Sequence, residues 1–272
     1  MAVLAVHDLS CYSKSSLTVV LPVLEALSVE TAVLPTALLS TQTDGFDDIY
    51  VKDNLESMKA ILCRFEKLGI SFDGIYTGYI GSADEIELVR SFVKDVDAPL
   101  LVDPVMGDGG ELYQTVGKDV VASMIKLVRK GDIITPNWTE AEIITELGYG
   151  KGKVSQRMIL DEIKVLRSLG PAKGVITGIP LEAGGLGNAA WDDDEVRLFQ
   201  YEDEGVSYPG SGDLFASLLF GLVMKGDSFF SAALNATNTA TYAVHMTKKN
   251  GRERRLGIML KPVMDEIRRR ML

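Results

Sequence analysis

The sequence predicts an α/β protein with a mostly parallel central sheet and helices on both of its faces. Two observations lead to this prediction. Short apolar segments bounded by turn or polar residues alternate with longer amphipathic segments, a pattern typical of a parallel sheet covered on both faces. No Pro- or Ser-rich linker divides the 272 residues, and their 46% hydrophobic content allows one large core. We therefore expect a single domain over residues 1–272.

The order of the elements follows from the spacing of the apolar residues. Buried strands are expected at short apolar runs, residues 3–6, 31–34, 74–77, 100–102, 133–135 and 174–177. Helices are expected where apolar residues recur at helical spacing, residues 16–27, 54–68, 83–96, 117–128, 139–147 and 155–169. Beyond residue 184 we expect a hairpin of strands at residues 187–191 and 196–201, joined by an acidic turn at residues 192–195. A helical cover is expected to follow, with helices at residues 214–225, 229–248 and 258–271.

Composition and charge exclude several classes of protein. A net charge of −10 is unfavourable for broad binding to nucleic acid, because phosphate backbones attract basic surfaces. The chain has no run of about 18 or more apolar residues, and its N-terminal segment lacks a basic region and a cleavage site, so we expect a cytoplasmic protein without a membrane partner. Cys11 and Cys63 are too few for a disulfide framework and lack zinc-ligand spacing, which favours reduced thiols.

A glycine turn before an apolar helix is the strongest indication of chemistry. Gly210, Ser211 and Gly212 can expose consecutive backbone N–H groups, and the helix behind them adds its positive dipole end, so the turn can hold a phosphate. Asp213 follows where phosphoryl transfer to an alcohol needs a base. Asp is also a favoured helix N-cap and Gly is frequent in loops, so this segment alone favours a structural and a catalytic role about equally.

Polar residues follow several expected strands, at the edge where ligands bind in open parallel sheets. Asp103, Asp108 and Glu140 are acidic, and Mg²⁺ would reconcile them with a nucleoside triphosphate because it accepts carboxylate oxygens. Taken singly, Asp103 also fits an Asp-Pro turn and Glu140 the first turn of a helix. Asp8 and Ser10 follow the first strand and can offer an acceptor and a donor to a small polar ring.

Other candidates carry no predicted chemistry. His7 and His245 are far apart without metal-ligand spacing, and they are expected to be a strand-end residue and a helix residue. Cys11 has no positioned base in the sequence. A dinucleotide-dependent oxidoreductase is disfavoured, because no G-x-G-x-x-G turn follows the first strand.

Six segments in order resemble the ribokinase-like superfamily, specifically its vitamin-kinase branch of pyridoxal/pyridoxamine kinases and hydroxymethylpyrimidine kinases. They span nearly the whole chain. They are Leu4-Ala5-Val6-His7-Asp8-Leu9-Ser10, residues 34–43, Tyr76-Thr77-Gly78-Tyr79-Ile80-Gly81-Ser82, residues 102–108, Thr135-Pro136-Asn137-Trp138-Thr139-Glu140 and Gly210-Ser211-Gly212-Asp213.

The resemblance implies roles for particular residues. Asp213 would be the catalytic base, and the amides of Gly210, Ser211 and Gly212 would form the anion hole. The residues implied for Mg²⁺ and the ATP phosphates are Asn137, Glu140, Asp103, Asp108 and Thr177, with Asp103 and Glu140 at the metal. The residues implied for the pyridine or pyrimidine ring are Asp8, Ser10 and Thr43, with Tyr79 as a pocket wall.

The activity that the resemblance implies is ATP-dependent phosphorylation of the 5'-hydroxymethyl group of a B6 vitamer, with ATP, Mg²⁺ and a monovalent cation such as K⁺ as cofactors and a homodimer as the assembly. Three alternatives stay open: a hydroxymethylpyrimidine (phosphate) kinase, a sugar or nucleoside kinase of the same fold, and a ligand-binding homologue without turnover. The last is disfavoured by the intact Asp213 and its glycines.

Two departures from the family pattern affect the substrate site. Pyridoxal kinases often have Ser where this chain has Asp8, and an acidic group there favours a cationic substituent such as the amine of pyridoxamine. Ser211 stands where Thr or Val is common, a change that a backbone anion hole tolerates. The segment after the first strand is too short for the β-sheet lid of sugar kinases, and the loop at residues 40–50 is expected to close over the site instead.

Overall fold

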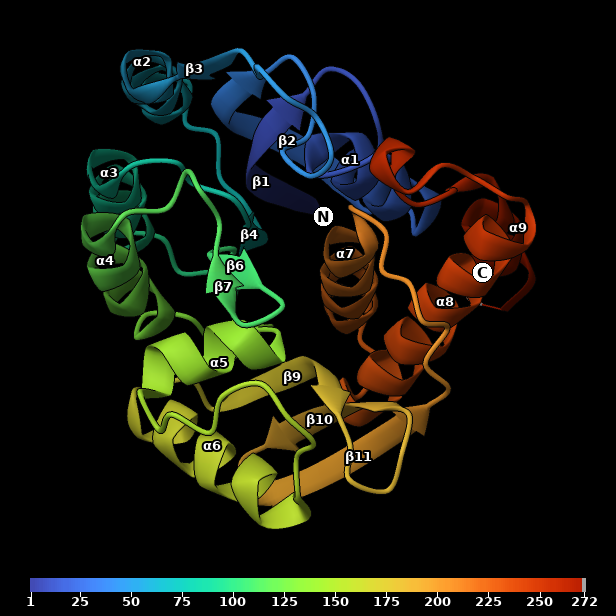
Figure 1. The fold of residues 1–272 in the computed structure, drawn as a ribbon. Helices are drawn as coiled ribbons and strands as arrows, with labels where there is room; N and C mark the ends of the chain where they lie inside the picture. The colour runs from blue at the N-terminus through green and yellow to red at the C-terminus, as the bar shows by residue number, and fades with distance from the viewer. Residues whose placement is uncertain (271–272) are drawn as a thin grey trace. The chain divides into compact units, whose positions relative to one another are not determined.

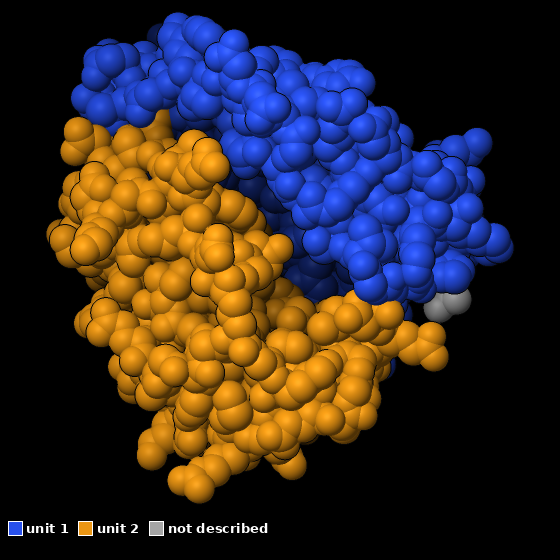
Figure 2. Space-filling view, in the orientation of Figure 1, with its two compact units in different colours: residues 1–80, 204–272 blue, residues 81–203 orange. Residues whose placement is uncertain are grey.

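The computed structural model describes residues 1–270. The chain divides into two compact units, residues 1–80 with 204–272 and residues 81–203 (Figure 2). Each unit pairs strands with helices in the order that the sequence predicts (Figure 1). The expectation of one domain over residues 1–272 stays a prediction.

The sheet portion of the first unit has the strand order β4-β1-β2-β3. Its strands are β1 (Ala2–Ser10), β2 (Glu30–Leu39), β3 (Val51–Asp53) and β4 (Gly74–Thr77). β1 pairs in parallel with both β2 and β4, and β3 adds to β2 in the antiparallel direction. Residues 3–8 of β1 are all buried, as expected of a strand with parallel neighbours and helices on its faces.

The helices of the first unit begin near the predicted residues. They are α1 (Leu17–Ala26), α2 (Leu55–Lys67), α7 (Ser211–Met224), α8 (Phe229–Lys249) and α9 (Lys261–Arg270), with a 3₁₀ turn at Arg254–Leu256. Residues 214–222 of α7 are buried almost without interruption. The helix predicted for residues 258–271 begins only at Lys261, because Pro262 suits a first helical turn, and residue 271 lies outside the described residues.

The second unit contains the strand order β11-β10-β9-β8-β5. Its strands are β5 (Leu100–Val102), β8 (Ile133–Ile134), β9 (Lys173–Pro180), β10 (Leu186–Asp192) and β11 (Glu195–Tyr201), and a separate hairpin is formed by β6 (Gly107–Asp108) and β7 (Glu111–Leu112). β5, β8 and β9 are parallel, whereas β10 and β11 form the predicted hairpin with its acidic turn. The helices are α3 (Ala83–Val93), α4 (Lys118–Val128), α5 (Trp138–Thr145) and α6 (Gln156–Ser168).

The predicted fold class is confirmed, since β1 pairs in parallel with β2 and β4 in one sheet portion, β5, β8 and β9 are parallel in the other, and the antiparallel strands β3, β10 and β11 are added at one end of a portion. Over residues 1–270, none of the helices combines the length and the apolar character needed to cross a bilayer.

Candidate functional site

The glycine turn places Asp213 in the first turn of α7. Gly210 is the N-cap residue, with φ of 84° in the left-handed region. A Cβ atom at this position would lie 2.5 Å from the carbonyl oxygen of Lys14. Both observations require glycine at residue 210, because left-handed backbone and close approach are each unfavourable for other residues. The turn is therefore specified by its contact with the segment after β1.

The three amides predicted for the anion hole differ in their hydrogen bonding. The Ser211 amide donates a hydrogen bond to the carbonyl oxygen of Tyr208 at 3.1 Å. The amides of Gly210 and Gly212 have no backbone acceptor within the described part of the chain. Two of the three predicted donors are thus available to an anion, and they lie at the positive end of a 14-residue helix.

The carboxylate of Asp213 is held on both oxygens. Its Oδ2 accepts a hydrogen bond from the Ser16 amide at 2.7 Å, and its Oδ1 lies 3.5 Å from Nε2 of His7. The side chain is 12% exposed. Burial raises the pKa of Asp213, the neighbouring His7 and the Ser16 amide lower it, and the charge of Asp8 raises it further. A largely enclosed carboxylate with a raised pKa is suited to accept a proton.

Sequence reasoning missed Ser16 as a site residue. Ser16 caps α1 with φ of 51°, which is uncommon for a residue other than glycine. This conformation directs its N–H to Asp213 while its carbonyl oxygen accepts from Val19 and Val20. The only signal in the sequence was a serine at the start of a predicted helix, which is common for structural reasons.

The predicted ring-binding residues lie at the end of β1. Ser10 Oγ donates to Oδ2 of Asp8 at 3.0 Å, and both residues are buried. The register between β1 and β2 shifts at Asp8, an irregularity of the kind that redirects side chains near active sites. Tyr79 is also buried, and its carbonyl oxygen accepts from Thr36 Oγ1 at 2.7 Å. Thr43 lies exposed in the loop at residues 40–50.

The loop at residues 40–50 is tied to the segment after α8. Gln42 Nε2 donates to the carbonyl oxygen of Arg255 at 3.2 Å, and Asp44 forms an ion pair with Arg254. The closing role predicted for this loop stays a prediction, and these contacts would have to be kept or exchanged during closure.

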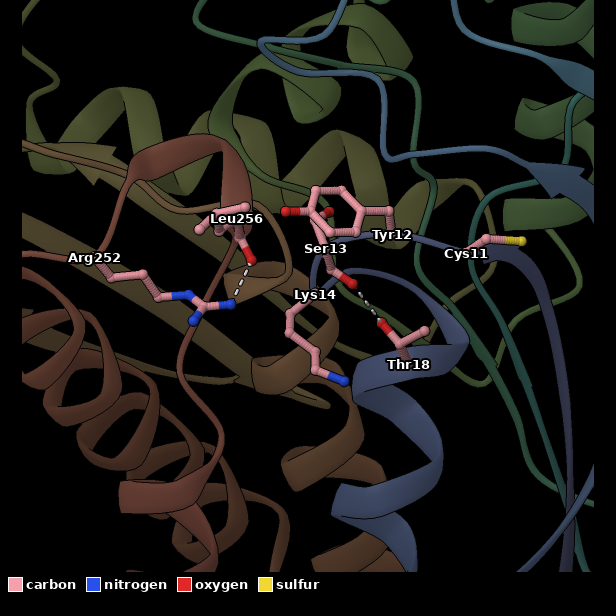
Figure 3. Close-up of a pocket in the computed structure, with 7 residues that line it drawn as sticks. All are labelled: Cys11, Tyr12, Ser13, Lys14, Thr18, Arg252 and Leu256. Carbon is pink, nitrogen blue, oxygen red and sulfur yellow. Dashed lines mark hydrogen bonds between the residues drawn. The ribbon is translucent and has the colours of Figure 1, made fainter.

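A pocket of about 360 Å³ lies beside this loop within the first unit (Figure 3). It is lined by Cys11, Tyr12, Ser13, Lys14, Thr18, Arg252 and Leu256. Arg252 donates to the carbonyl oxygen of Leu256 at 2.8 Å. Lys14 and Arg252 are half-buried, and neither is paired with a carboxylate within residues 1–270. The pocket therefore has a cationic lining.

In the second unit, Asn137 and Glu140 form a capping box at the start of α5. Asn137 Oδ1 accepts from the Glu140 amide and Glu140 Oε2 accepts from the Asn137 amide, each at 2.9 Å. Glu140 Oε1 accepts from the Met106 amide at 3.0 Å, and Asn137 Nδ2 donates to the carbonyl oxygen of Gly107 at 2.8 Å. The Asn-x-x-Glu element therefore fastens α5 to the turn that follows β5.

Burial raises the pKa of Glu140 to about 8, and the charge of Asp108 contributes in the same direction. Asp108 itself is exposed, and its Oδ1 accepts from the Gly109 amide at 2.7 Å. Asp103 is buried after β5. The amide of Thr177 donates to the carbonyl oxygen of Pro136 at 2.9 Å, which brings Thr177 beside Asn137. The predicted phosphate and metal residues thus gather at the ends of β5, β8 and β9.

Solved structures share this fold over nearly the whole chain. A Bacteroides thetaiotaomicron protein, solved in a crystal form with pyridoxal, has a TM-score of 0.90 at 33% identity and covers 98% of this chain and 95% of its own. Pyridoxal kinase from Lactobacillus plantarum has a TM-score of 0.90 at 30% identity and covers 98% of this chain and 96% of its own. The protein is thus of the ribokinase-like α/β class.

A family model described as phosphomethylpyrimidine kinase matches residues 21–256, and the chain belongs to this family. A curated Schizosaccharomyces pombe relative is 30% identical over 163 residues, which are 56% of this chain and 46% of that protein. The matched region therefore spans about half the length of that relative.

Proposed function

We propose that this protein is an ATP-dependent kinase that phosphorylates the 5'-hydroxymethyl group of a B6 vitamer, pyridoxal, pyridoxamine or pyridoxine. The observation that carries the proposal is the placement of Asp213, a carboxylate only 12% exposed in the first turn of α7 directly behind the glycine turn. Membership of a kinase family and the likeness to a Lactobacillus plantarum pyridoxal kinase support this substrate class.

In the proposed reaction, the hydroxymethyl oxygen of the substrate attacks the γ-phosphorus of ATP. Its proton passes to the carboxylate of Asp213, and the bond between the γ-phosphorus and the β,γ-bridging oxygen breaks, so that ADP leaves. The amides of the glycine turn stabilise the negative charge that develops on the transferred group. The fixed Ser16 amide keeps Asp213 oriented without any change at the moment of reaction.

The residues proposed for Mg²⁺ and the triphosphate are Asp103, Asp108, Asn137, Glu140 and Thr177. Within residues 1–270, no group of three or more His, Cys, Asp or Glu side chains is arranged to hold a metal ion. This donor set fits a Mg²⁺ that keeps phosphate oxygens and water among its ligands, as nucleotide-bound Mg²⁺ does. The carboxylate of Glu140 accepts N–H groups of Met106, Asn137 and Gly107, and a carboxylate has about four acceptor sites, so a lone pair remains for such a contact. Bound Mg²⁺ would neutralise phosphate charge.

Asp8 and Ser10 are proposed to recognise the ring, together with Tyr79 and Thr43. Replacing Asp8 by Ser should shift the substrate preference from pyridoxamine towards pyridoxal, because a buried carboxylate favours a cationic substituent. The ratio of kcat/KM for the two substrates measures this preference. A substitution of Asp53, an exposed carboxylate on β3, is the control. An unchanged ratio in Asp8→Ser would contradict the prediction.

The alternative acceptor is a hydroxymethylpyrimidine or its phosphate, and a specific observation favours it as the second candidate. The pocket lined by Cys11 carries two cations, Lys14 and Arg252, that have no carboxylate partner within residues 1–270, and these would suit a substrate that already bears a phosphate. A coupled assay of ADP release with pyridoxal, pyridoxamine, pyridoxine and hydroxymethylpyrimidine should show turnover highest with a B6 vitamer. Highest turnover with the pyrimidine would select the alternative, and no turnover with any alcohol would indicate a ligand-binding homologue.

Several features accompany the proposal. ATP is the proposed phosphoryl donor, and a monovalent cation such as K⁺ is a further proposed cofactor. A homodimer and a cytoplasmic location remain predictions from the family resemblance and the composition.

A further inference from the structure

His7 lies in the middle of β1 and is completely buried. The flanking β2 and β4 pair with β1 in parallel, so the imidazole stands in the interior of the first unit. The edge of its ring contacts Tyr76 of β4, with the ring centroids 5.3 Å apart and an interplanar angle of 83°. A histidine in such a position costs free energy when charged unless carboxylates compensate it.

Two carboxylates approach the imidazole from opposite nitrogens. Nε2 of His7 lies 3.5 Å from Oδ1 of Asp213, and Nδ1 lies 3.8 Å from Oδ1 of Asp8. Both distances exceed an ordinary hydrogen bond, so an attraction at this range is electrostatic and requires a protonated imidazole. In each carboxylate the other oxygen, Oδ2, is already fixed, by the Ser16 amide in Asp213 and by Ser10 Oγ in Asp8.

The backbone directly after β4 leaves room for this arrangement. A Cβ atom at Gly78 would lie 1.7 Å from Nε2 of His7, which no side chain can tolerate. The Gly78 amide donates to the carbonyl oxygen of Val6 at 3.0 Å, so the backbone cannot move away without losing a bond of the sheet. Glycine at residue 78 therefore keeps the imidazole in place between the two carboxylates.

We propose that His7 is a positioning residue that holds the base Asp213 and links it electrostatically to Asp8, the carboxylate proposed to recognise the ring. The inference rests on the proposed function of Asp213. The negative charges of Asp8 and Asp213 repel each other, and an imidazolium between them offsets this repulsion. Loss of the imidazole therefore affects both the orientation of Asp213 and its proton affinity.

The expected effect on proton affinity has a definite sign. The titratable groups that face His7 include Asp8 on β1, Asp213 on α7 and Tyr76 on β4. His7 lowers the pKa of Asp213, whereas burial and the charge of Asp8 raise it. In His7→Gln the lowering influence is lost, so the pKa of Asp213 rises. The base then remains protonated up to a higher pH, and the acidic limb of kcat/KM moves to higher pH.

The first test requires no turnover. The chain contains two histidines, and the second, His245, forms a hydrogen bond of 2.8 Å with Glu204 on the surface, which provides an internal control. We expect NMR titration to show the pKa of His7 lowered in Asp213→Asn, while the signals of His245 serve as the internal reference. A titration of His7 unchanged in Asp213→Asn would overturn the inference and leave the proposed role of Asp213 intact.

The second test is the pH profile of the vitamer kinase reaction. His7→Gln and Gly78→Ala should both move the acidic limb to higher pH, because the second substitution displaces the same imidazole. Gly152→Ala is the control, since a Cβ atom there meets nothing within 4 Å. A lower kcat with an unmoved limb in both variants would show that His7 only packs and would refute the inference. If the proposed function fails, Asp213→Asn itself retains turnover, whatever His7 does.

Discussion

Replacement of Asp213 by Asn should lower turnover by about 10²–10⁴-fold, the usual contribution of a general base. The variant keeps the side-chain size and an oxygen that can accept from the Ser16 amide, so the fold and the affinity for ATP should be unchanged. The loss should appear in kcat measured with saturating vitamer and nucleotide. Equilibrium binding of ATP, measured by calorimetry, separates a catalytic loss from a failure to bind.

A matched substitution makes this result specific. Asp84 also lies in the first turn of a helix, α3, but it is exposed. Asp84→Asn should therefore leave kcat close to that of the natural chain. Near-normal turnover by Asp213→Asn would remove this carboxylate from the mechanism and with it the proposed function.

Replacement of Gly210 by Ala should have the second largest effect, a loss of roughly 10²–10³-fold in kcat, as when a donor to developing charge is displaced. The added Cβ atom would meet the carbonyl oxygen of Lys14 at 2.5 Å, so the turn must shift. Its amides would then no longer point at the transferred phosphoryl group. The left-handed backbone adds a stability cost of about 1–2 kcal/mol for a residue other than glycine. Steady-state kinetics and urea unfolding measure the two effects separately.

Gly205 provides the control for backbone conformation alone. It has φ of 68°, also in the left-handed region, but a Cβ atom there meets nothing within 4 Å. Gly205→Ala should therefore show the loss in free energy of unfolding without the loss in kcat. Equal kinetic effects in the two variants would mean that the catalytic loss at Gly210 reflects general destabilisation, which would contradict the proposed anion hole.

Local sequence patterns were sufficient for much of the fold. The run at residues 3–6 predicted β1, and the spacing of apolar residues at 155–169 predicted α6 to within one residue at each end. The hairpin of β10 and β11 followed from two runs on either side of an acidic turn. The short strands β3, β6 and β7 were missed, because two or three residues are too few to show a period.

The candidate site was predictable only where it is encoded by consecutive residues. The glycine turn and the Asn-x-x-Glu element could be recognised because their chemistry depends on local spacing. The structure adds that Glu140 binds the Met106 amide and that the Ser211 amide is engaged by Tyr208. Neither bond could be inferred from the sequence, since each depends on how a loop is folded over a helix end.

The sequence by itself determined which residues carry the candidate chemistry and that strands alternate with helices, because periodicity and turn residues act over a few positions. Only the tertiary structure decided what surrounds Asp213. Ser16 is separated from Asp213 by 197 residues along the chain, and His7 lies on β1. Their approach depends on the packing of α7 beside β1 and α1 and on the missing side chain of Gly78. Packing over such separations leaves no periodic signal in a single sequence.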